Sequence, residues 1–290
     1  MNLIKSNKCE FKDENTELIS LFIENNNGTY EKKDELFKLS KQIIEKDLNS
    51  INLLTSEFSL YVLSVNNKLL TIKKLANYLS FEDTIPKIFS SKIFINNKEE
   101  KKYLMEFIKF GNTQFDFINK ISGFEGAISL YSLFRLIEQN KMTYFLTYLD
   151  IISFQKVLIF SIISGHSDIN HRNVMLKYDN NTNKIKFKLI DFNDSLNYEF
   201  KNINYNLLIF QYGIFGKLLN KAKILNNELY ENLKKINIIN LSEIIPNKIN
   251  RKRFIQVINI FIKKLNRNID LIEYIKNFII SFNKNKKSLK

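Results

Sequence analysis

The two histidines of the chain lie close together in one polar segment, residues 165–175, which reads GHSDINHRNVM. A second polar segment, DFND at 191–194, follows two short runs that have the pattern of a β-hairpin. Phosphoryl transfer uses groups of this kind, because one carboxylate can orient an acceptor hydroxyl while a second carboxylate and an amide oxygen hold Mg²⁺. Asp168, Asn173 and Asp191 supply these groups, so the sequence predicts Mg²⁺-dependent phosphoryl transfer.

The spacing of these residues resembles two motifs of the protein-kinase-like superfamily. His166, Asp168 and Asn173 match the catalytic-loop pattern H-x-D-x-x-x-x-N, and residues 190–193 resemble the metal-binding D-F-G segment. The resemblance implies that Asp168 orients the acceptor hydroxyl, that His166 supports the loop, and that Asn173 and Asp191 bind the metal. It also implies ATP and Mg²⁺ as cofactors, and an α+β, two-lobed fold with a small antiparallel-sheet lobe and a larger helical lobe.

Two other interpretations of the same segment are weaker. His166, Asp168 and His171 lack a further His or Cys and would make an incomplete transition-metal site. No G-x-S-x-G elbow accompanies them, which argues against a Ser-His-Asp hydrolase. We therefore expect His171 to be a structural residue.

The segment KYLMEFIKFG at 102–111 resembles the last strand of a kinase small lobe where it runs into the hinge. The resemblance implies that backbone groups of Glu106 and Ile108 bind adenine and that Met105 takes the gatekeeper position. The preceding IPKIF at 85–89 resembles the entry to the fourth strand of such folds, which favours a hinge over a simple edge strand.

Two alignments of the small lobe compete for the lysine that would bind the ATP phosphates. In the first, LTIKKL at 70–75 is a strand that resembles the kinase pattern V-A-I-K, so Lys73 binds the phosphates and Glu82 is its partner. In the second, 61–65 is that strand, Ser64 replaces the family lysine, and a helix follows, as in aminoglycoside-phosphotransferase-like enzymes. The first is preferred because a polar turn separates the two runs, and Lys73 is the expected cation in either. In the second alignment, one face of the helix is predicted to face the protein interior. That face comprises Leu69, Ile72, Leu75, Ala76 and Leu79.

Several features depart from an ordinary protein kinase. None of the seven glycines lies between Gly28 and Gly111, so the small lobe has no G-x-G-x-x-G loop over the phosphates. Ser167 replaces the arginine of H-R-D, and no A-P-E motif follows Asp191. The leading hypothesis is a compact, atypical Ser/Thr protein kinase acting on a protein substrate, similar to shortened kinases of large DNA viruses and intracellular bacteria. The alternatives are a small-molecule kinase of the aminoglycoside or choline type, and a pseudokinase scaffold.

The apolar pattern divides the chain into four parts. Residues 1–47 are predicted to form a partly helical N-terminal extension, with a helix at 34–46. Residues 48–110 form the small lobe with about five antiparallel strands, 111–282 form the helical lobe, and 283–290 form a basic tail. The predicted strands are 51–54, 60–65, 69–75, 87–95 and 103–110, with a later hairpin at 174–178 and 185–190. The predicted helices are 113–121, 127–139, 143–164, 205–221, 253–265 and 270–282.

Composition indicates which partners, which cellular compartment and which kinds of segment the chain is expected to have. The formal net charge is +14, but only five of the 44 basic residues are arginines, and abundant Lys, Asn and Ile are typical of an AT-rich genome. Solvated lysine surfaces are therefore preferred over a nucleic-acid partner. The single cysteine, Cys9, excludes an intramolecular disulfide, and the absence of an apolar leader predicts a cytoplasmic protein. The most apolar stretch, 145–165, is interrupted by polar residues, so no transmembrane segment is predicted.

Overall fold

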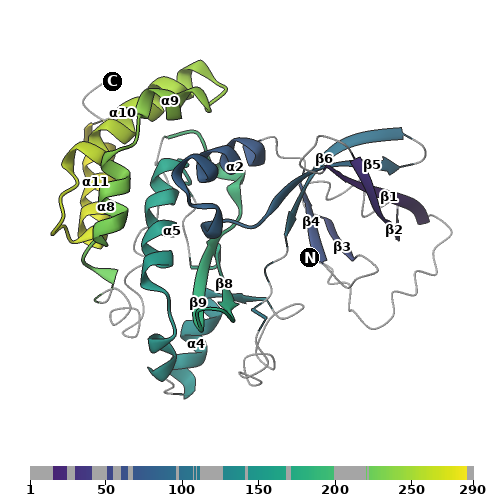
Figure 1. Cartoon of the computed structure of the whole chain (residues 1–290), viewed down its shortest axis with the longest axis horizontal. Coiled ribbons are helices and arrows are strands. Elements are labelled where there is room, and N and C mark those ends of the chain that lie inside the picture. Colours follow the sequence, from purple (N-terminus) through teal and green to yellow (C-terminus); the bar gives the residue numbers. More distant parts are fainter. Residues whose placement is uncertain are drawn as a thin grey trace. The chain divides into compact units, whose positions relative to one another are not determined.

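The computed structural model (Figure 1) describes residues 16–24, 30–40, 51–54, 60–64, 68–95, 98–106, 108, 110–111, 127–140, 143–167, 171–198, 220 and 222–285. Asp168 lies outside the described residues, as do the predicted helix at 113–121 and all but Asn220 of the one at 205–221. Internal contacts divide the chain into two compact units. The first comprises Met1–Leu70 and Pro86–Ile108, and the second comprises Thr71–Ile85 and Lys109–Lys290.

The described strands of the first unit form one sheet, and they are β1 (Thr16–Glu24), β2 (Tyr30–Ser40), β3 (Ile51–Leu54), β4 (Leu60–Ser64), β5 (Ile88–Ile95) and β6 (Lys98–Glu106). Their order is β2-β1-β5-β6-β4-β3, and all neighbouring pairs are antiparallel. β5 and β6 form a hairpin, in which Ile95 pairs with Lys98. β6 overlaps the predicted strand at 103–110, but it starts earlier, at Lys98, and ends earlier, at Glu106.

The predicted helix at 34–46 is wrong where the structure describes it, because residues 34–40 belong to β2. Leu36 and Leu39 are three residues apart, which suits a helix, but Leu36 pairs with Ile19 and Leu39 with Glu17 across the β1–β2 ladder. Pairing with a neighbouring strand outweighs local periodicity in such cases. Since β1 also pairs with β5, residues 16–24 belong to the main sheet.

The predicted strand at 69–75 is also wrong, because these residues form the helix α2 (Lys68–Leu79). Between β4 and β5 the chain therefore forms the helix α2 and then the short 3-10 helix η1 (Glu82–Thr84). The element described next after β4 is a helix, and not the strand of the first alignment. The five positions that the second alignment turned inward are all buried, at spacings typical of one helix face, and they are Leu69, Ile72, Leu75, Ala76 and Leu79.

The second unit is built around α5 (Ile151–Ile163), which is buried on almost all sides. The Asp150 carboxylate accepts a hydrogen bond from the Ser153 N–H (3.0 Å) and thereby caps the first turn. α5 packs on β9 (Lys184–Leu189), where the rings of Phe154 and Phe187 lie 5.0 Å apart. β9 pairs with β8 (Val174–Asp179), and β8 with the short β7 (Ile128–Ser129), which leads into α4 (Leu130–Asn140). The 3-10 helix η4 (Thr143–Thr147) connects α4 to this core.

The described C-terminal residues form α8 (Asn227–Lys234), α9 (Ile238–Glu243), α10 (Lys248–Lys264) and α11 (Leu271–Asn285). Asn226, Asn237 and Asn247 cap the first three of these helices, since each side chain accepts backbone N–H bonds from the first turn. The predicted helices at 253–265 and 270–282 are confirmed, although α10 begins earlier and α11 ends later.

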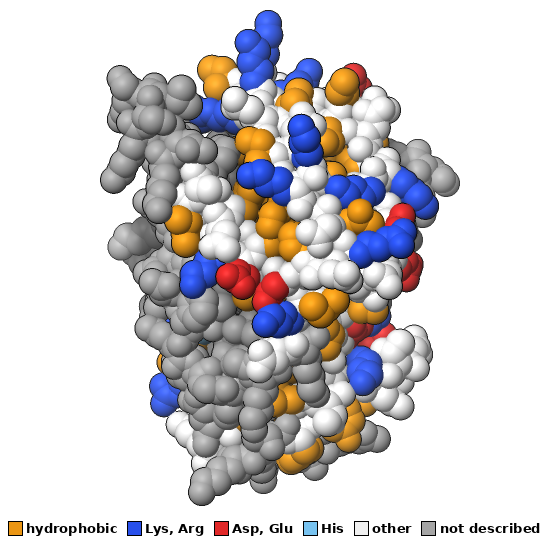
Figure 2. Space-filling view, turned by 90° about the vertical axis from the view of Figure 1, so that its left-hand side faces the viewer, with side chains coloured by type: hydrophobic (Ala, Val, Ile, Leu, Met, Phe, Trp, Pro, Cys, Tyr) orange, Lys and Arg blue, Asp and Glu red, His pale blue; other side chains and the backbone are white. Residues whose placement is uncertain are grey.

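The face formed by these helices carries many Lys and Arg side chains, which are scattered among hydrophobic ones (Figure 2). Acidic side chains are fewer on this face, in keeping with the net charge of +14. This distribution agrees with solvated lysine surfaces on the visible face. Within the part of the chain that the structure describes, no helix has both the length and the apolar character to cross a membrane.

Candidate active site

The β8–β9 hairpin brings two of the predicted site residues together. Val174 pairs with Leu189, and at the open end of the ladder the Ile190 N–H donates to the Asn173 carbonyl (2.9 Å). Asn173 therefore lies opposite Ile190, and Asp191 is the next residue along the chain. Asn173 is half-buried and Asp191 is exposed. The fold thus places an amide and a carboxylate at adjacent strand ends, as the sequence predicted.

His166 supports the same point from a different segment. Its ring is fully buried, and Nε2 lies 3.0 Å from the Ile190 carbonyl oxygen. The ring also meets the edge of the buried Phe192 ring, with centroids 5.7 Å apart. Both backbone groups of Ile190 are thus held, the N–H by Asn173 and the carbonyl by His166. The predicted supporting position of His166 is in keeping with this geometry.

Asp191 adopts a backbone conformation that is unusual for a residue with a side chain. Its φ of 59° and ψ of 68° lie in the left-handed region, and it occupies the N-cap position of the 3-10 helix η5 (Phe192–Asp194) without a side-chain capping bond. Non-glycine residues in this region are uncommon and are found where the surroundings impose the conformation, often at functional sites. Here the neighbours are Ile190, whose backbone N–H and carbonyl both have partners, and the buried Phe192.

The segment before residue 168 is tied to the segment after Asp191. The N–H and Oγ of Ser167 both donate to the Asp194 carbonyl, at 3.2 and 2.9 Å. The Leu196 N–H donates to the Ser164 carbonyl at 2.8 Å. These bonds hold the residues before Asp168 in register with the Asp191 segment.

Gly165 and Tyr198 pack against each other beneath this connection. Gly165 has a φ of +60°, and a Cβ at this position would lie 2.8 Å from Cδ1 of Tyr198. The Tyr198 hydroxyl donates to the Ile163 carbonyl (3.0 Å), and complete burial raises the pKa of Tyr198 well above its ordinary value. Glycine suits this turn best, because a side chain here would both contact the Tyr198 ring too closely and strain the left-handed backbone.

The segment after residue 170 is held by α4. The Tyr131 N–H donates to the His171 carbonyl (3.0 Å), and the two rings lie 4.7 Å apart. His171 is buried, which agrees with the structural role expected for it. The described residues contain no group of three or more His, Cys, Asp or Glu able to hold a metal ion.

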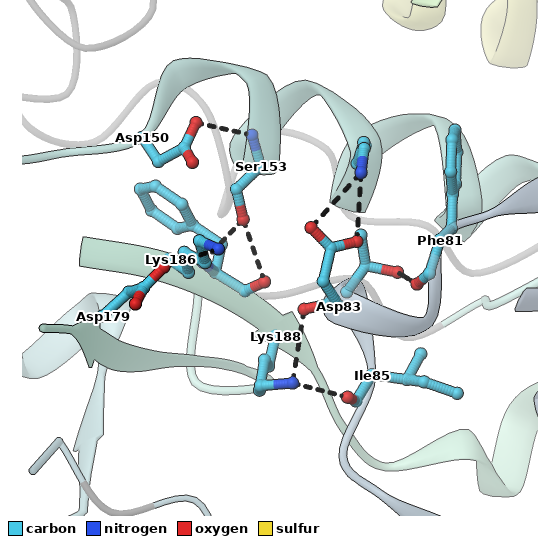
Figure 3. Close-up of polar contacts among 11 residues, drawn as sticks. Phe81, Asp83, Ile85, Asp150, Ser153, Asp179, Lys186 and Lys188 are labelled. Carbon is cyan, nitrogen blue, oxygen red and sulfur yellow. Dashed lines mark hydrogen bonds and ion pairs between the residues drawn. The ribbon is translucent and has the colours of Figure 1, made fainter. Parts of the chain in front are cut away.

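A buried lysine that the sequence analysis missed joins β9 to η1 (Figure 3). Lys188 Nζ donates to the carbonyls of Ile85 (2.8 Å) and Asp83 (3.3 Å), and the residue is only 9% exposed. The Asp83 carboxylate in turn accepts from Lys156 of α5 (3.1 Å). Lysines alternate with apolar residues along β9, which predicts an exposed Lys188, but the burial does not follow that alternation at residues 187–189. Lys188 fixes the strand that leads to Asp191.

The cofactor-binding residues predicted for the small lobe are all among the described residues, and their roles remain predictions. Lys73 lies on the helix α2, as the second alignment expects and not on the strand of the first. Glu82 lies in η1. In the first unit, the Glu106 N–H donates to the Lys87 carbonyl (2.8 Å) and Ile108 is buried. Adenine binding by Glu106 and Ile108 remains a prediction.

Comparisons with known proteins add little to this description. No family model matches the chain, and no curated protein matches it. Among solved structures, the chain is similar to the proinflammatory kinase CtkA of Helicobacter pylori, with 12% identity and a TM-score of 0.38, over 80% of this chain and 94% of that chain. A likeness at this level does not bear on function, so the assignment rests on the residues themselves.

Proposed function

We propose that this protein is a kinase-like phosphotransferase that moves the γ-phosphoryl group of ATP, with Mg²⁺, to a hydroxyl of a protein substrate. One observation carries the proposal. The Ile190 backbone is held between the Asn173 carbonyl and the His166 ring, so Asn173 and the left-handed, exposed Asp191 lie at the same end of a hairpin. These residues come from the two motifs that resemble the kinase catalytic loop and metal segment.

The residues present fit the metal that this chemistry requires. Mg²⁺ prefers oxygen ligands and takes only one or two protein groups, keeping water and phosphate oxygens for the rest. The Asn173 amide oxygen and the Asp191 carboxylate would supply two such ligands. When bound, Mg²⁺ would neutralise charge on the transferred phosphates.

The roles of the other groups follow from the proposed chemistry. Asp168 would accept the proton of the acceptor hydroxyl as that oxygen bonds to the γ-phosphorus and the bond to the β-phosphate oxygen breaks, releasing ADP. His166 is a positioning residue, since it contacts the Ile190 carbonyl. Its neighbour Ser167 anchors the loop through Asp194.

A second candidate is a small-molecule phosphotransferase. It is favoured by the passage from β4 into the helix α2, whose buried face is the one expected from the aminoglycoside-phosphotransferase-like alignment. In that alignment Ser64 of β4 stands where the family has lysine, so nucleotide affinity would depend more heavily on the metal side of the site.

The test is phosphate transfer from labelled ATP in the presence of Mg²⁺, with basic proteins and small alcohols as acceptors. We expect label on protein, and its loss in Asp168→Asn and Asp191→Ala. Asp194→Ala is the matched control, because Asp194 is also exposed and lies in the same short segment. Label on alcohols alone would favour the second candidate.

Binding provides a readout that does not depend on turnover. ATP with Mg²⁺ at 100-fold above its Kd should stabilise the wild-type fold by about 2.7 kcal/mol, seen as a rise in Tm. Asp191→Ala should lose the Mg²⁺-dependent part of this rise, whereas Asp194→Ala should keep it. A wild-type protein whose Tm is unaffected by nucleotide would be a scaffold and would overturn the proposal.

A further inference from the structure

Two arginines converge on one tyrosine beside the candidate active site. The Arg172 guanidinium carbon lies 5.2 Å from the centroid of the Tyr131 ring, and that of Arg135 lies 5.9 Å from it. Arg135 also donates to the Tyr131 hydroxyl (3.2 Å). Only five of the 44 basic residues of this chain are arginines, so lysine bias does not account for two of them at one ring.

The backbone holds this cluster in place. Tyr131 and Arg135 are four residues apart on α4 and therefore share one face of the helix. The hydrogen bond from the Tyr131 N–H to the His171 carbonyl brings the neighbouring Arg172 to that face. Both arginines are exposed to solvent.

The surroundings add further positive potential. Tyr131 lies in the first turn of α4, where the helix dipole contributes partial positive charge. Guanidinium groups that stack on an aromatic ring are partly ordered, and each can bind a carboxylate or phosphate through two parallel hydrogen bonds. Two such groups over the ring of Tyr131, which lies in the first turn of α4, favour an anion.

The cluster also lies near the proposed catalytic centre. Arg172 immediately precedes the proposed metal ligand Asn173, and it follows Asp168 by four residues. Four residues of chain span at most about 14 Å, even when fully extended. An acceptor peptide reaching from Asp168 to Arg172 would therefore place an anionic group within a few residues of its hydroxyl.

We propose that Tyr131, Arg135 and Arg172 form a specificity site for an anionic group, a phosphoryl or carboxylate, carried by the acceptor peptide near the hydroxyl that is phosphorylated. This inference rests on the proposed phosphotransferase function and names its substrate class. The enzyme would act on acidic or previously phosphorylated segments.

The test compares serine peptides that are identical except for one position near the serine, occupied by alanine, glutamate or phosphoserine. The wild-type enzyme should show a kcat/KM at least tenfold higher for an anionic peptide than for the neutral one. Arg135→Ala and Arg172→Ala should each bring this ratio close to one. Arg135→Lys should restore part of it, because it keeps the charge but loses the planar fork. Glutamate and phosphoserine distinguish the two sources of the anion.

Arg267→Ala is the matched control. Arg267 is also exposed and also lies over a tyrosine ring, at 5.8 Å from the centroid of Tyr230. It should leave the ratio unchanged. An equal fall of the ratio in Arg267→Ala would show a general effect of net charge and would overturn the inference.

Direct binding separates the inference from the proposed function. A phosphopeptide whose acceptor serine is alanine should bind the wild-type protein, and its Kd by calorimetry should rise about tenfold in Arg135→Ala. An unchanged Kd, or equal kcat/KM for neutral and anionic peptides, would overturn the inference while leaving the phosphotransferase intact. If no acceptor is phosphorylated, the proposed function fails, and binding alone decides whether the anion site exists.

Discussion

Gly165 provides the sharpest test of how the loop before Asp168 is held. It combines a left-handed backbone, with a φ of +60°, and close contact with a buried ring. Tyr198 cannot move away easily, since it is fully buried and its hydroxyl bonds to the Ile163 carbonyl. We therefore expect Gly165→Ala to destabilise the fold and to displace His166, the next residue.

The magnitude follows from two contributions. A residue with a Cβ in the left-handed region costs about 1–2 kcal/mol relative to its preferred backbone. The added Cβ would lie 2.8 Å from Cδ1 and 2.9 Å from Cε1 of Tyr198, well inside the usual contact distance of about 3.5–4.0 Å. Overpacking of this kind costs about 1–3 kcal/mol. The free energy of unfolding should therefore fall by about 2–5 kcal/mol.

Urea unfolding followed by far-UV circular dichroism measures this change, and a double-mutant cycle separates its causes. In a Tyr198→Leu background the ring contact is gone, so Gly165→Ala should cost only the backbone strain of about 1–2 kcal/mol. Gly111→Ala is the control, since Gly111 has a φ of 79° but is exposed. A cost below about 1 kcal/mol for Gly165→Ala, or the same cost in both backgrounds, would refute the reasoning.

Two further predictions concern the β8–β9 hairpin, which leads to Asp191. Lys188→Met should lower the free energy of unfolding, measured by urea titration, by about 2–4 kcal/mol, because it removes the donor to the Asp83 and Ile85 carbonyls at a buried position. Lys184→Met is the control, since Lys184 is exposed and bonds to one carbonyl. Its loss in the same titration should stay below about 1 kcal/mol. Asp179 is predicted to stabilise the fold in a pH-dependent way, since the hydrogen-bonded ion pair with Lys186 (2.8 Å), and then bonds from Thr182 and Asn181, lower its pKa to about 2.

The sign of the pH effect follows from that direction. Because the pKa of Asp179 is lower in the folded than in the unfolded chain, the folded state favours the carboxylate, and its contribution is complete above the ordinary value of 3.8. The contribution is lost as the pH falls from about 4 toward about 2. The stability difference between the wild type and Asp179→Asn should therefore shrink over this range. A difference that stays constant from about pH 6 to about pH 2 would contradict the assignment.

Local pattern predicted many of the elements correctly. β8 and β9 start and end within one residue of the predicted hairpin, because their apolar residues alternate and a polar turn separates them. The two confusions of helix and strand, at 34–46 and 69–75, fell on runs whose apolar spacing suits both. In each, the choice depended on a partner outside the run, the neighbouring strand β1 in one case and the core that buries α2 in the other. The helix predicted at 143–164 is divided into η4 and α5.

The candidate site shows the same division between local and distant information. The sequence alone marked His166, Asn173 and Asp191, because polar groups of those types at those spacings belong to phosphoryl-transfer motifs. It could not reveal Lys188 or the ring of Tyr131 as neighbours of the site. Lys188 meets Ile85 across 103 residues of chain, and Arg172 lies over Tyr131 across the β7–β8 pairing.

The sequence by itself determined which groups are available for chemistry and the order in which a hairpin presents them, since both depend on residue type and short-range spacing. Only the tertiary structure decided which backbone groups hold those side chains. The N–H of the half-buried Ile190 donates to the Asn173 carbonyl, and the Ile190 carbonyl lies within hydrogen-bond distance of the His166 ring, so both backbone groups are satisfied. Asp191 follows Ile190 directly, in a left-handed conformation.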